Sequence, residues 1–346
     1  MRVVVVGASG NIGTAVLRRL REDATITSLV GVARRAPRQT PPPPYDVEWV
    51  QCHIGAAGAD EPVVAALADA FAGANAVVHL AWAIQPSHDR SYQRAVNVEG
   101  TRRIVAAVRR AGVPHLVVAS SVGVYGPAHD DEPKDERFPA TGVPTSDYSV
   151  DKADMERVLD EAEAADAGLA ITRMRPALVF QRDAGHEIHG IFLGRLVPGR
   201  LLDGRVPVLP WPRGVRVQAV HADDLAEAFR EAIVRQARGA FNLAGPGVLR
   251  GPDVAAVLSQ SKLREVPPTA LRAGLLAAWH ARLAPIGPGW LDLAASVPLL
   301  DTSRAEEMLG WRPRRTAQEA LRELVDGIAD GAGTVSPPLR ARHLRA

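Results

Sequence analysis

The sequence has little cysteine, little net charge and no long apolar run. It has one cysteine, Cys52, among 346 residues, so no disulfide can form within the chain. Its formal net charge of +2 creates no field of the kind that gathers nucleic acid. The most apolar late stretch, residues 271–284, contains Arg272, His280 and Arg282 and is shorter than the roughly 20 apolar residues of a membrane span. These scarcities predict a protein with neither nucleic-acid nor membrane partners. Because the first residues already predict a strand, we expect no signal peptide and a cytoplasmic location.

What the sequence does contain, at its start, is a β-branched run that leads straight into three regularly spaced glycines. Residues 3–6 predict a buried strand, and residues 14–22 have apolar side chains at helical spacing. In a strand-to-helix turn of this kind, one glycine permits the bend, one lets the backbone approach a pyrophosphate, and one allows close packing of helix and strand. The spacing departs from the strict Gly-x-Gly-x-x-Gly pattern. The turn nevertheless predicts a dinucleotide site that comprises Gly7, Ser9, Gly10, Asn11, Ile12 and Gly13.

Three further residues predict hydride-transfer chemistry. Tyr148 and Lys152 lie four residues apart at the start of an amphipathic stretch, so their side chains share one helix face. A free tyrosine has a pKa of about 10, and a neighbouring lysine cation is expected to lower that pKa, which suits the phenol to exchange a proton with an alcohol or carbonyl oxygen. Ser121 ends another predicted strand, where its hydroxyl could hydrogen-bond the same oxygen. The alternative is a tyrosine that merely begins a helix, beside a solvated lysine.

Together these motifs resemble the extended short-chain dehydrogenases/reductases, also called the NAD-dependent epimerase/dehydratase family. The resemblance rests on Gly7-x-x-Gly10-x-x-Gly13, on residues 120–126 and on Tyr148-x-x-x-Lys152, and it extends over about residues 1–328. It implies that Ser121 orients the substrate, that Tyr148 is the acid/base, and that Lys152 holds the cofactor ribose and tunes Tyr148. It also implies cofactor contacts from Leu80, Ala81, Asn97, Tyr148, Lys152 and Pro176. For Asn97, a buried structural amide is the alternative.

The end of the second predicted strand carries arginine where NAD-selective sites carry a carboxylate. In those sites an acidic residue about 20 positions beyond the glycines binds the ribose 2′-hydroxyl. Here the strand of residues 28–33 is followed by Arg34 and Arg35, and a guanidinium can bind a 2′-phosphate through two hydrogen bonds. The sequence therefore favours NADP, with NAD as the alternative cofactor. Two arginines pointing into solvent are the alternative interpretation of the pair.

Strand and helix signals alternate through the first half of the chain. This alternation predicts an α/β fold, a Rossmann doubly wound parallel sheet with a smaller, discontinuous C-terminal substrate domain. Residues 1–180 and 215–245 are expected to form the NAD(P)-binding domain, residues 181–214 and 246–328 the substrate-binding domain, and residues 329–346 a tail that is mobile from Pro337. The predicted strands are residues 3–6, 28–33, 47–50, 76–80, 116–120, 169–174 and 215–220.

The resemblance leaves more than one reaction open. Sugar-nucleotide dehydratases of this kind usually carry an Asp-Glu pair just after the serine, where this chain has Val122 and Gly123, so dehydration is not expected. Epimerases commonly carry an asparagine after the sixth strand, and residues 173–177 contain none. A diphosphate could still be bound by four arginines: Arg195, Arg200, Arg205 and Arg213. The alternative is that these arginines form a solvated basic surface.

Our leading hypothesis is an NAD(P)-dependent oxidoreductase that moves hydride between a nicotinamide and a carbonyl or alcohol of a small, rather apolar molecule. One alternative is a nucleotide-sugar epimerase with tightly bound NAD, and another, of a different class, is an NADP-sensing protein without turnover. His186 and His189 lack the spacing of a helical zinc motif, so no metal is expected. By the resemblance, the helices predicted over residues 93–110 and 148–165 could pair two copies into a homodimer.

Overall fold

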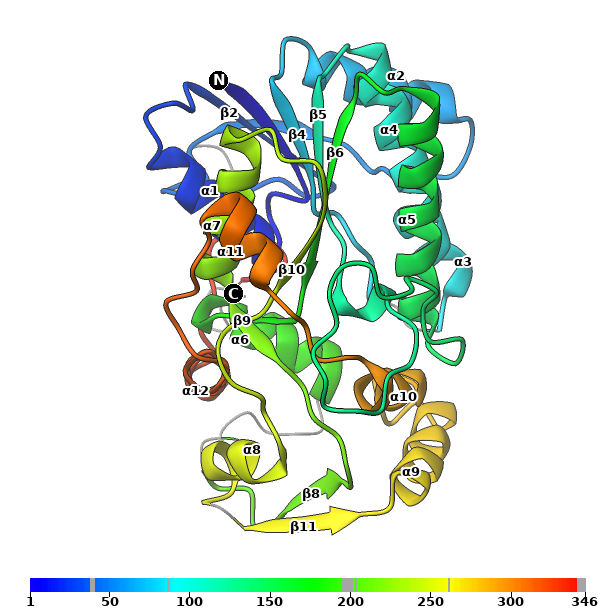
Figure 1. Ribbon diagram of the computed structural model, residues 1–346, viewed down its shortest axis with the longest axis vertical. Helices are drawn as coiled ribbons and strands as arrows, with labels where there is room; N and C mark the ends of the chain where they lie inside the picture. Colours follow the sequence, from blue (N-terminus) through cyan, green and yellow to red (C-terminus); the bar gives the residue numbers. More distant parts are fainter. Residues whose placement is uncertain (38–40, 86–87, 195–201, 203, 261, 341–346) are drawn as a thin grey trace.

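The computed structural model describes residues 1–37, 41–85, 88–194, 202, 204–260 and 262–340. These residues form a seven-stranded parallel sheet in the order β10-β6-β5-β4-β1-β2-β3, with helices on both faces (Figure 1). The predicted Rossmann arrangement is confirmed. Its strands are β1 (Arg2–Val6), β2 (Ser28–Ala33), β3 (Glu48–Gln51), β4 (Ala76–His79), β5 (His115–Ala119), β6 (Ala170–Pro176) and β10 (Gly239–Leu243).

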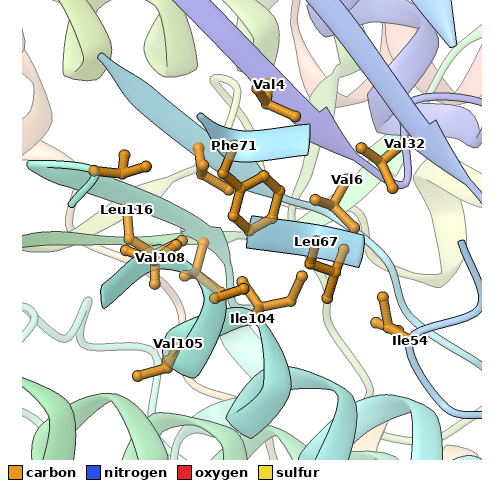
Figure 2. Packing of buried hydrophobic residues seen from close by; sticks show 14 of the residues in the cluster. Val4, Val6, Val32, Ile54, Leu67, Phe71, Ile104, Val105, Val108 and Leu116 are labelled. Atoms are coloured by element: carbon orange, nitrogen blue, oxygen red, sulfur yellow. The ribbon is translucent and has the colours of Figure 1, made fainter. Parts of the chain in front are cut away.

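Each face of the sheet packs against its own apolar core. Successive side chains of a strand such as β1 point to opposite faces, so β1 contributes to both cores. Val4 and Val6 pack with Phe71 and Ile104 in one apolar cluster (Figure 2). Val3 and Val5 belong to the cluster on the other face. The first face is covered by α2 (Asp60–Phe71), α4 (Gly100–Arg110) and α5 (Asp147–Ala165), and the second by α1 (Asn11–Arg21), α7 (Ala222–Val234) and α11 (Ser303–Leu309).

The seventh predicted strand, residues 215–220, is mostly wrong. Only Ala219–His221 form a strand there, β9, and it pairs with β7 (Leu178–Phe180) outside the main sheet. The reason is that β10 takes the free edge of β6, which leaves β9 to pair with the strand that follows β6.

A smaller group of elements lies beyond the carboxyl edge of the sheet (Figure 1). Its helix α9 (Pro268–His280) is rich in apolar side chains, yet none of its residues is fully buried. Such a helix borders open space rather than a closed core. The other elements of this group are β8 (Leu209–Pro212), β11 (Leu263–Val266), α8 (Gly251–Leu258) and α10 (Gly289–Ser296).

Short helices and one long helix complete the fold. Helix α12 (Ala317–Asp330) packs against η3 (Arg182–Ala184) and α6 (Gly185–Ile188). Every described helix is too short or too polar to cross a membrane. The remaining short helices are α3 (Arg90–Arg94), η1 (Ala95–Glu99), η2 (Val122–Val124) and η4 (His189–Leu193).

The C-terminal segment after α12 is packed as far as the structure describes it. The side chains of Ser336 and Leu339 are fully buried. The expected mobile end from Pro337 is therefore wrong up to residue 340, and residues 341–346 lie outside the described residues. The predicted domain boundaries stay a prediction.

Candidate active site

The three glycines of the first turn suit a dinucleotide for steric reasons. Gly7 has a φ of +87°, and a Cβ there would lie 2.6 Å from the Ala81 backbone nitrogen. A Cβ on Gly13 would lie 2.3 Å from the Gly7 carbonyl oxygen. At Gly10 the nearest atom would be 3.5 Å away, so this position borders open space. Packing thus requires Gly7 and Gly13, while Gly10 lies where a pyrophosphate could approach the backbone.

The turn lies where the strand order reverses, because β1 is flanked by β4 on one side and β2 on the other. Helix α1 begins there without an acidic residue in its first turn and without a side-chain cap, so its first N–H groups are available to an anion. The Asn11 amide is engaged elsewhere: it donates to the Val179 carbonyl at 3.2 Å and accepts from the Gln181 amide at 2.6 Å. Asn11 can therefore meet a phosphate through its backbone.

Ser121, Tyr148 and Lys152 come together at the carboxyl edge of the sheet. Ser121 and Tyr148 both lie beside Gly123, where an added Cβ would be 3.4 Å from the Ser121 Oγ and 2.9 Å from the Tyr148 ring, and the Ser121 hydroxyl accepts from the Gly123 N–H at 3.0 Å. The Lys152 Nζ lies 5.9 Å from the centroid of the Tyr148 ring and donates to the Ala119 carbonyl at 2.8 Å. This is the grouping that the sequence predicts, and the roles of the three side chains remain a prediction.

Burial sets the protonation of this group. It raises the pKa of the half-buried Tyr148 to about 12, with the hydrogen bond to Ser121 acting in the opposite direction. It lowers the pKa of Lys152 to about 7, although the carboxylates of Glu156 and Asp151 oppose this. The expectation that Lys152 lowers the Tyr148 pKa is not met in this structure, because desolvation of the phenol raises that pKa.

Trp82 belongs to the site, and the sequence analysis misses it. The Lys152 Nζ lies 3.6 Å from the Trp82 ring centroid, a cation–π contact. The Trp82 ring also packs edge-on against Tyr148 at 5.8 Å between centroids. Its Nε1 is buried and has no hydrogen-bond partner among the described residues. The available signal is its position directly after Leu80 and Ala81, which the resemblance places at the cofactor.

An aromatic-walled cavity of about 230 Å³ adjoins Tyr148. Trp290 packs against the Tyr148 ring at 4.8 Å between centroids, and Trp279 lines another side. The described lining includes two carboxylates, Asp147 and Asp151, and no lysine or arginine. Arg90 pairs with both carboxylates, at 3.2 Å from Asp147 and 2.5 Å from Asp151, so their charge is offset. Because the described lining offers an anion no lysine or arginine, the cavity suits a neutral molecule better.

The side-chain amide of Asn97 is hydrogen-bonded to other groups of the protein. It lies in the π-helical turn η1, where its amide donates to the Ala83 carbonyl at 3.0 Å and to Asp151 at 3.2 Å and accepts from the Ala83 N–H at 2.7 Å. The fully buried Asp151 also accepts two hydrogen bonds from Arg90, at 2.5 and 2.6 Å. These contacts support the structural interpretation of Asn97, as a clamp between the loop after β4 and helix α5.

The other predicted cofactor residues lie at the same edge of the sheet. Leu80 and Ala81 lie against Gly7, and Pro176 is the last residue of β6. Arg34 is exposed and donates a hydrogen bond to the Tyr92 hydroxyl. Arg35 is also exposed, and its charge opposes the rise by which burial brings the pKa of Glu187 to about 7.

The arginines considered for a diphosphate do not line the described cavity. Arg213 lies 3.7 Å from Glu265, and neither Arg213 nor Arg205 belongs to the cavity's described lining. Arg195 and Arg200 lie outside the described residues. Within the described ranges, no group of three or more His, Cys, Asp or Glu side chains is arranged to hold a metal ion.

Comparison with known proteins identifies the family of the chain. The model of the NAD dependent epimerase/dehydratase family matches residues 3–244. The chain belongs to this family. The matched residues of this epimerase/dehydratase family chain include the glycine-rich turn after β1, and the resemblance inferred from the sequence is confirmed.

Named relatives include UDP-glucose 4-epimerase of Mycolicibacterium smegmatis, 29% identical over 338 residues, which are 94% of this chain and 98% of that protein. An uncharacterized protein of Mycobacterium tuberculosis is 26% identical over 354 residues, which cover 100% of this family member and 32% of that protein. The chain thus spans about a third of the length of the first curated relatives it matches.

Among solved structures, the dTDP-glucose 4,6-dehydratase DesIV of Streptomyces venezuelae, with NAD and TYD bound, has a TM-score of 0.71. It is 20% identical and the match covers 98% of this chain and 100% of DesIV. The UDP-glucose 4-epimerase of Thermus thermophilus in complex with NAD has a TM-score of 0.67 at 20% identity, covering 95% of this chain and 99% of that one. These likenesses show that the epimerase/dehydratase chain shares their fold.

Proposed function

We propose that this family member is an NADP-dependent oxidoreductase that transfers hydride between the nicotinamide and the carbonyl or alcohol carbon of a small neutral molecule. The observation that carries the proposal is the grouping of Ser121 and Tyr148 beside Gly123, with the Lys152 Nζ 5.9 Å from the Tyr148 ring centroid, next to an aromatic-walled cavity. When bound at the glycine turn, the nicotinamide cofactor would supply or accept the hydride.

Tyr148 is suited to supply the proton of a reduction. With a pKa of about 12, its phenol is protonated at neutral pH and acts as an acid. In the proposed direction the Tyr148 Oη donates its proton to the carbonyl oxygen while the carbon gains hydride, which yields the alcohol. Ser121 orients the same oxygen, and the protonated form of Lys152 stabilises the phenolate until solvent restores the proton.

The cavity favours a neutral substrate. Its described lining combines Trp279, Trp290 and Tyr148 with the carboxylates of Asp147 and Asp151. Arg90 pairs with both carboxylates, at 3.2 Å from Asp147 and 2.5 Å from Asp151, so it is engaged on the protein. A nucleoside diphosphate would bring at least two negative charges to a cavity whose described lining contains no lysine or arginine to bind them. NADP is preferred as the cofactor because Arg34 and Arg35 follow β2 and no carboxylate does.

The second candidate function is a nucleotide-sugar epimerase with tightly bound NAD. The observation in its favour is the similarity to the UDP-glucose 4-epimerase of M. smegmatis along nearly the full length of both chains. The absence of lysine and arginine from the described lining of the cavity opposes it. The third possibility is an NADP-sensing protein without turnover. Such a protein would bind the cofactor and convert no substrate.

The test begins with the wild-type chain. Any copurifying nicotinamide nucleotide is identified by mass spectrometry, and turnover is followed by nicotinamide absorbance with NADPH or NADH and a panel of neutral aldehydes and ketones. We expect exchangeable NADP and reduction of apolar carbonyl compounds. Retained NAD together with interconversion of UDP-sugars would instead establish the epimerase, and binding without any turnover would establish the sensor.

Tyr148→Phe then tests the acid/base. Its turnover should fall by about 10²–10⁴-fold while cofactor binding is retained. The matched control is Tyr125→Phe, which removes a buried hydroxyl that donates to Asn242 at 2.6 Å and lies outside the described cavity lining. An unchanged rate in Tyr148→Phe would rule out the assigned role.

A further inference from the structure

The C-terminal segment of residues 332–340 lies against the back of the dinucleotide turn. The Ser336 hydroxyl is fully buried and donates to the Ser9 carbonyl at 2.6 Å. The segment is closed on itself by the Thr334 N–H, which donates to the Leu339 carbonyl at 2.7 Å. The family model ends at residue 244, well before this segment.

A second connection to the turn runs through side-chain hydroxyls. Thr14 Oγ1 donates its one hydrogen to the Gly10 carbonyl at 2.9 Å, so the Tyr45 hydroxyl, 2.9 Å away, must donate to Thr14. The single hydroxyl hydrogen of Tyr45 is then used toward Thr14, so Thr334 Oγ1 must donate to the Tyr45 hydroxyl, 2.7 Å away. Thr334 Oγ1 in turn accepts from the Ser336 N–H at 3.1 Å. All four hydrogen bonds therefore point one way, from Ser336 to Gly10.

Both connections end on consecutive carbonyls of the turn, those of Ser9 and Gly10. The Gly10 carbonyl belongs to the same peptide unit as the Asn11 N–H, the first N–H of α1, which has no intrahelical partner. A hydrogen bond to a carbonyl polarises its peptide and strengthens the N–H as a donor. It also fixes the orientation of that peptide, which an anion would otherwise have to order on binding.

We propose that residues 332–340 form a C-terminal brace for the cofactor site, and that Ser336 is a positioning residue that holds the glycine turn in the shape that binds a dinucleotide pyrophosphate. The brace acts through Ser9 and Gly10 and does not itself touch the cofactor. This inference rests on the proposed dinucleotide site.

The test compares two buried serines. Ser336→Ala removes the hydroxyl that donates to the turn, while Ser259→Ala removes a buried hydroxyl that donates to the Lys262 carbonyl at 2.8 Å, at the end of α8 and far along the chain from the turn. Both variants should lose similar thermal stability, because each loses one buried hydrogen bond. We expect Ser336→Ala to bind NADPH about five- to tenfold more weakly by fluorescence titration, and Ser259→Ala to bind it as the wild type does.

Tyr45→Phe provides an independent variant in case Ser336→Ala fails to fold. It breaks the hydroxyl chain between Thr334 and Thr14 and keeps the ring that packs beside Trp49. Weaker NADPH binding by Tyr45→Phe, with faster hydrogen exchange of the amides of residues 8–13, supports the brace. Wild-type affinity in both Ser336→Ala and Tyr45→Phe overturns it. A wild-type chain that binds neither NADPH nor NADH overturns the proposed function instead, and the brace with it.

Discussion

Replacing Lys152 by methionine is expected to stabilise the chain at neutral pH while it removes a residue that we assign to catalysis. Lys152 is almost fully buried, and burial lowers its pKa from 10.5 to about 7. At about 1.4 kcal/mol per pH unit, the difference corresponds to about 5 kcal/mol of unfolding free energy. This is the cost of keeping the buried ammonium charged in the folded chain.

Part of this cost is offset by contacts that methionine would lose. The cation–π contact with Trp82 contributes about 0.5–2 kcal/mol, and the hydrogen bond from the ammonium to the Ala119 carbonyl about 1.5–3 kcal/mol. Subtracting both, together about 2–5 kcal/mol, leaves an expected net gain of about 0–3 kcal/mol for Lys152→Met at pH 7. The variant should be inactive, so stability and activity should change in opposite directions.

The sign of the pH dependence follows from the lowered pKa. Above about pH 10.5 lysine is neutral in both the folded and the unfolded chain, so the charge cost is absent. As the pH falls from 10.5 to about 7, the unfolded chain binds a proton that the folded chain does not, and the wild type loses stability relative to Lys152→Met. Below about pH 7 the difference stays constant.

Urea unfolding of wild type and Lys152→Met at several pH values between about 6 and about 10 measures this difference. The control is Lys262→Met, which replaces an exposed lysine and should leave the unfolding free energy nearly unchanged. A Lys152→Met chain less stable than the wild type at pH 7, or a stability difference that does not depend on pH, would refute the reasoning.

Two further substitutions separate binding from folding. Gly13→Ala should destabilise or unfold the chain, because its Cβ would lie 2.3 Å from the Gly7 carbonyl oxygen. Gly10→Ala should keep its thermal stability and lose NADPH affinity, because only the cofactor side of that position is open. Thermal unfolding and fluorescence titration of both variants measure these two effects, and equal behaviour of the two variants would contradict the prediction. Asp151→Ala leaves the Arg90 guanidinium without the carboxylate that accepts two of its hydrogen bonds. The variant should lose about 2–4 kcal/mol of unfolding free energy, measured by urea unfolding, a value that is reduced because Arg90 is partly exposed. A loss below about 1 kcal/mol would show that the Arg90–Asp151 pair contributes little to stability.

The electrostatics of the site bear on the choice between reductase and epimerase. The cavity beside Tyr148 has carboxylates and indole rings in its described lining, and its walls come from the loop after β4, from α5 and from α9 and α10. The first two belong to the sheet domain and the last two to the smaller group of elements. Under the proposed function, substrate choice would be made where two distant parts of the chain meet, which is why the family alone does not define it.

The sequence by itself determined six of the seven strands of the sheet and the glycine turn, because these depend on local properties, whereas β10 was not predicted. A β-branched run predicts β1, alternating strand and helix signals predict the doubly wound order, and the spacing of Gly7, Gly10 and Gly13 predicts the turn. Tyr148 and Lys152 were also predictable as neighbours, since four residues along a helix bring two side chains to one face. Ser121 followed from its position at the end of a strand.

Only the tertiary structure decided how these side chains behave. The pKa of Tyr148 rises because the phenol is desolvated by packing against Trp82 and Trp290, and no local pattern reports desolvation. The contact between Ser336 and Ser9 joins residues 327 positions apart. Hydrogen bonds and burial between such distant segments depend on how the whole chain packs, which residue spacing along the sequence does not encode.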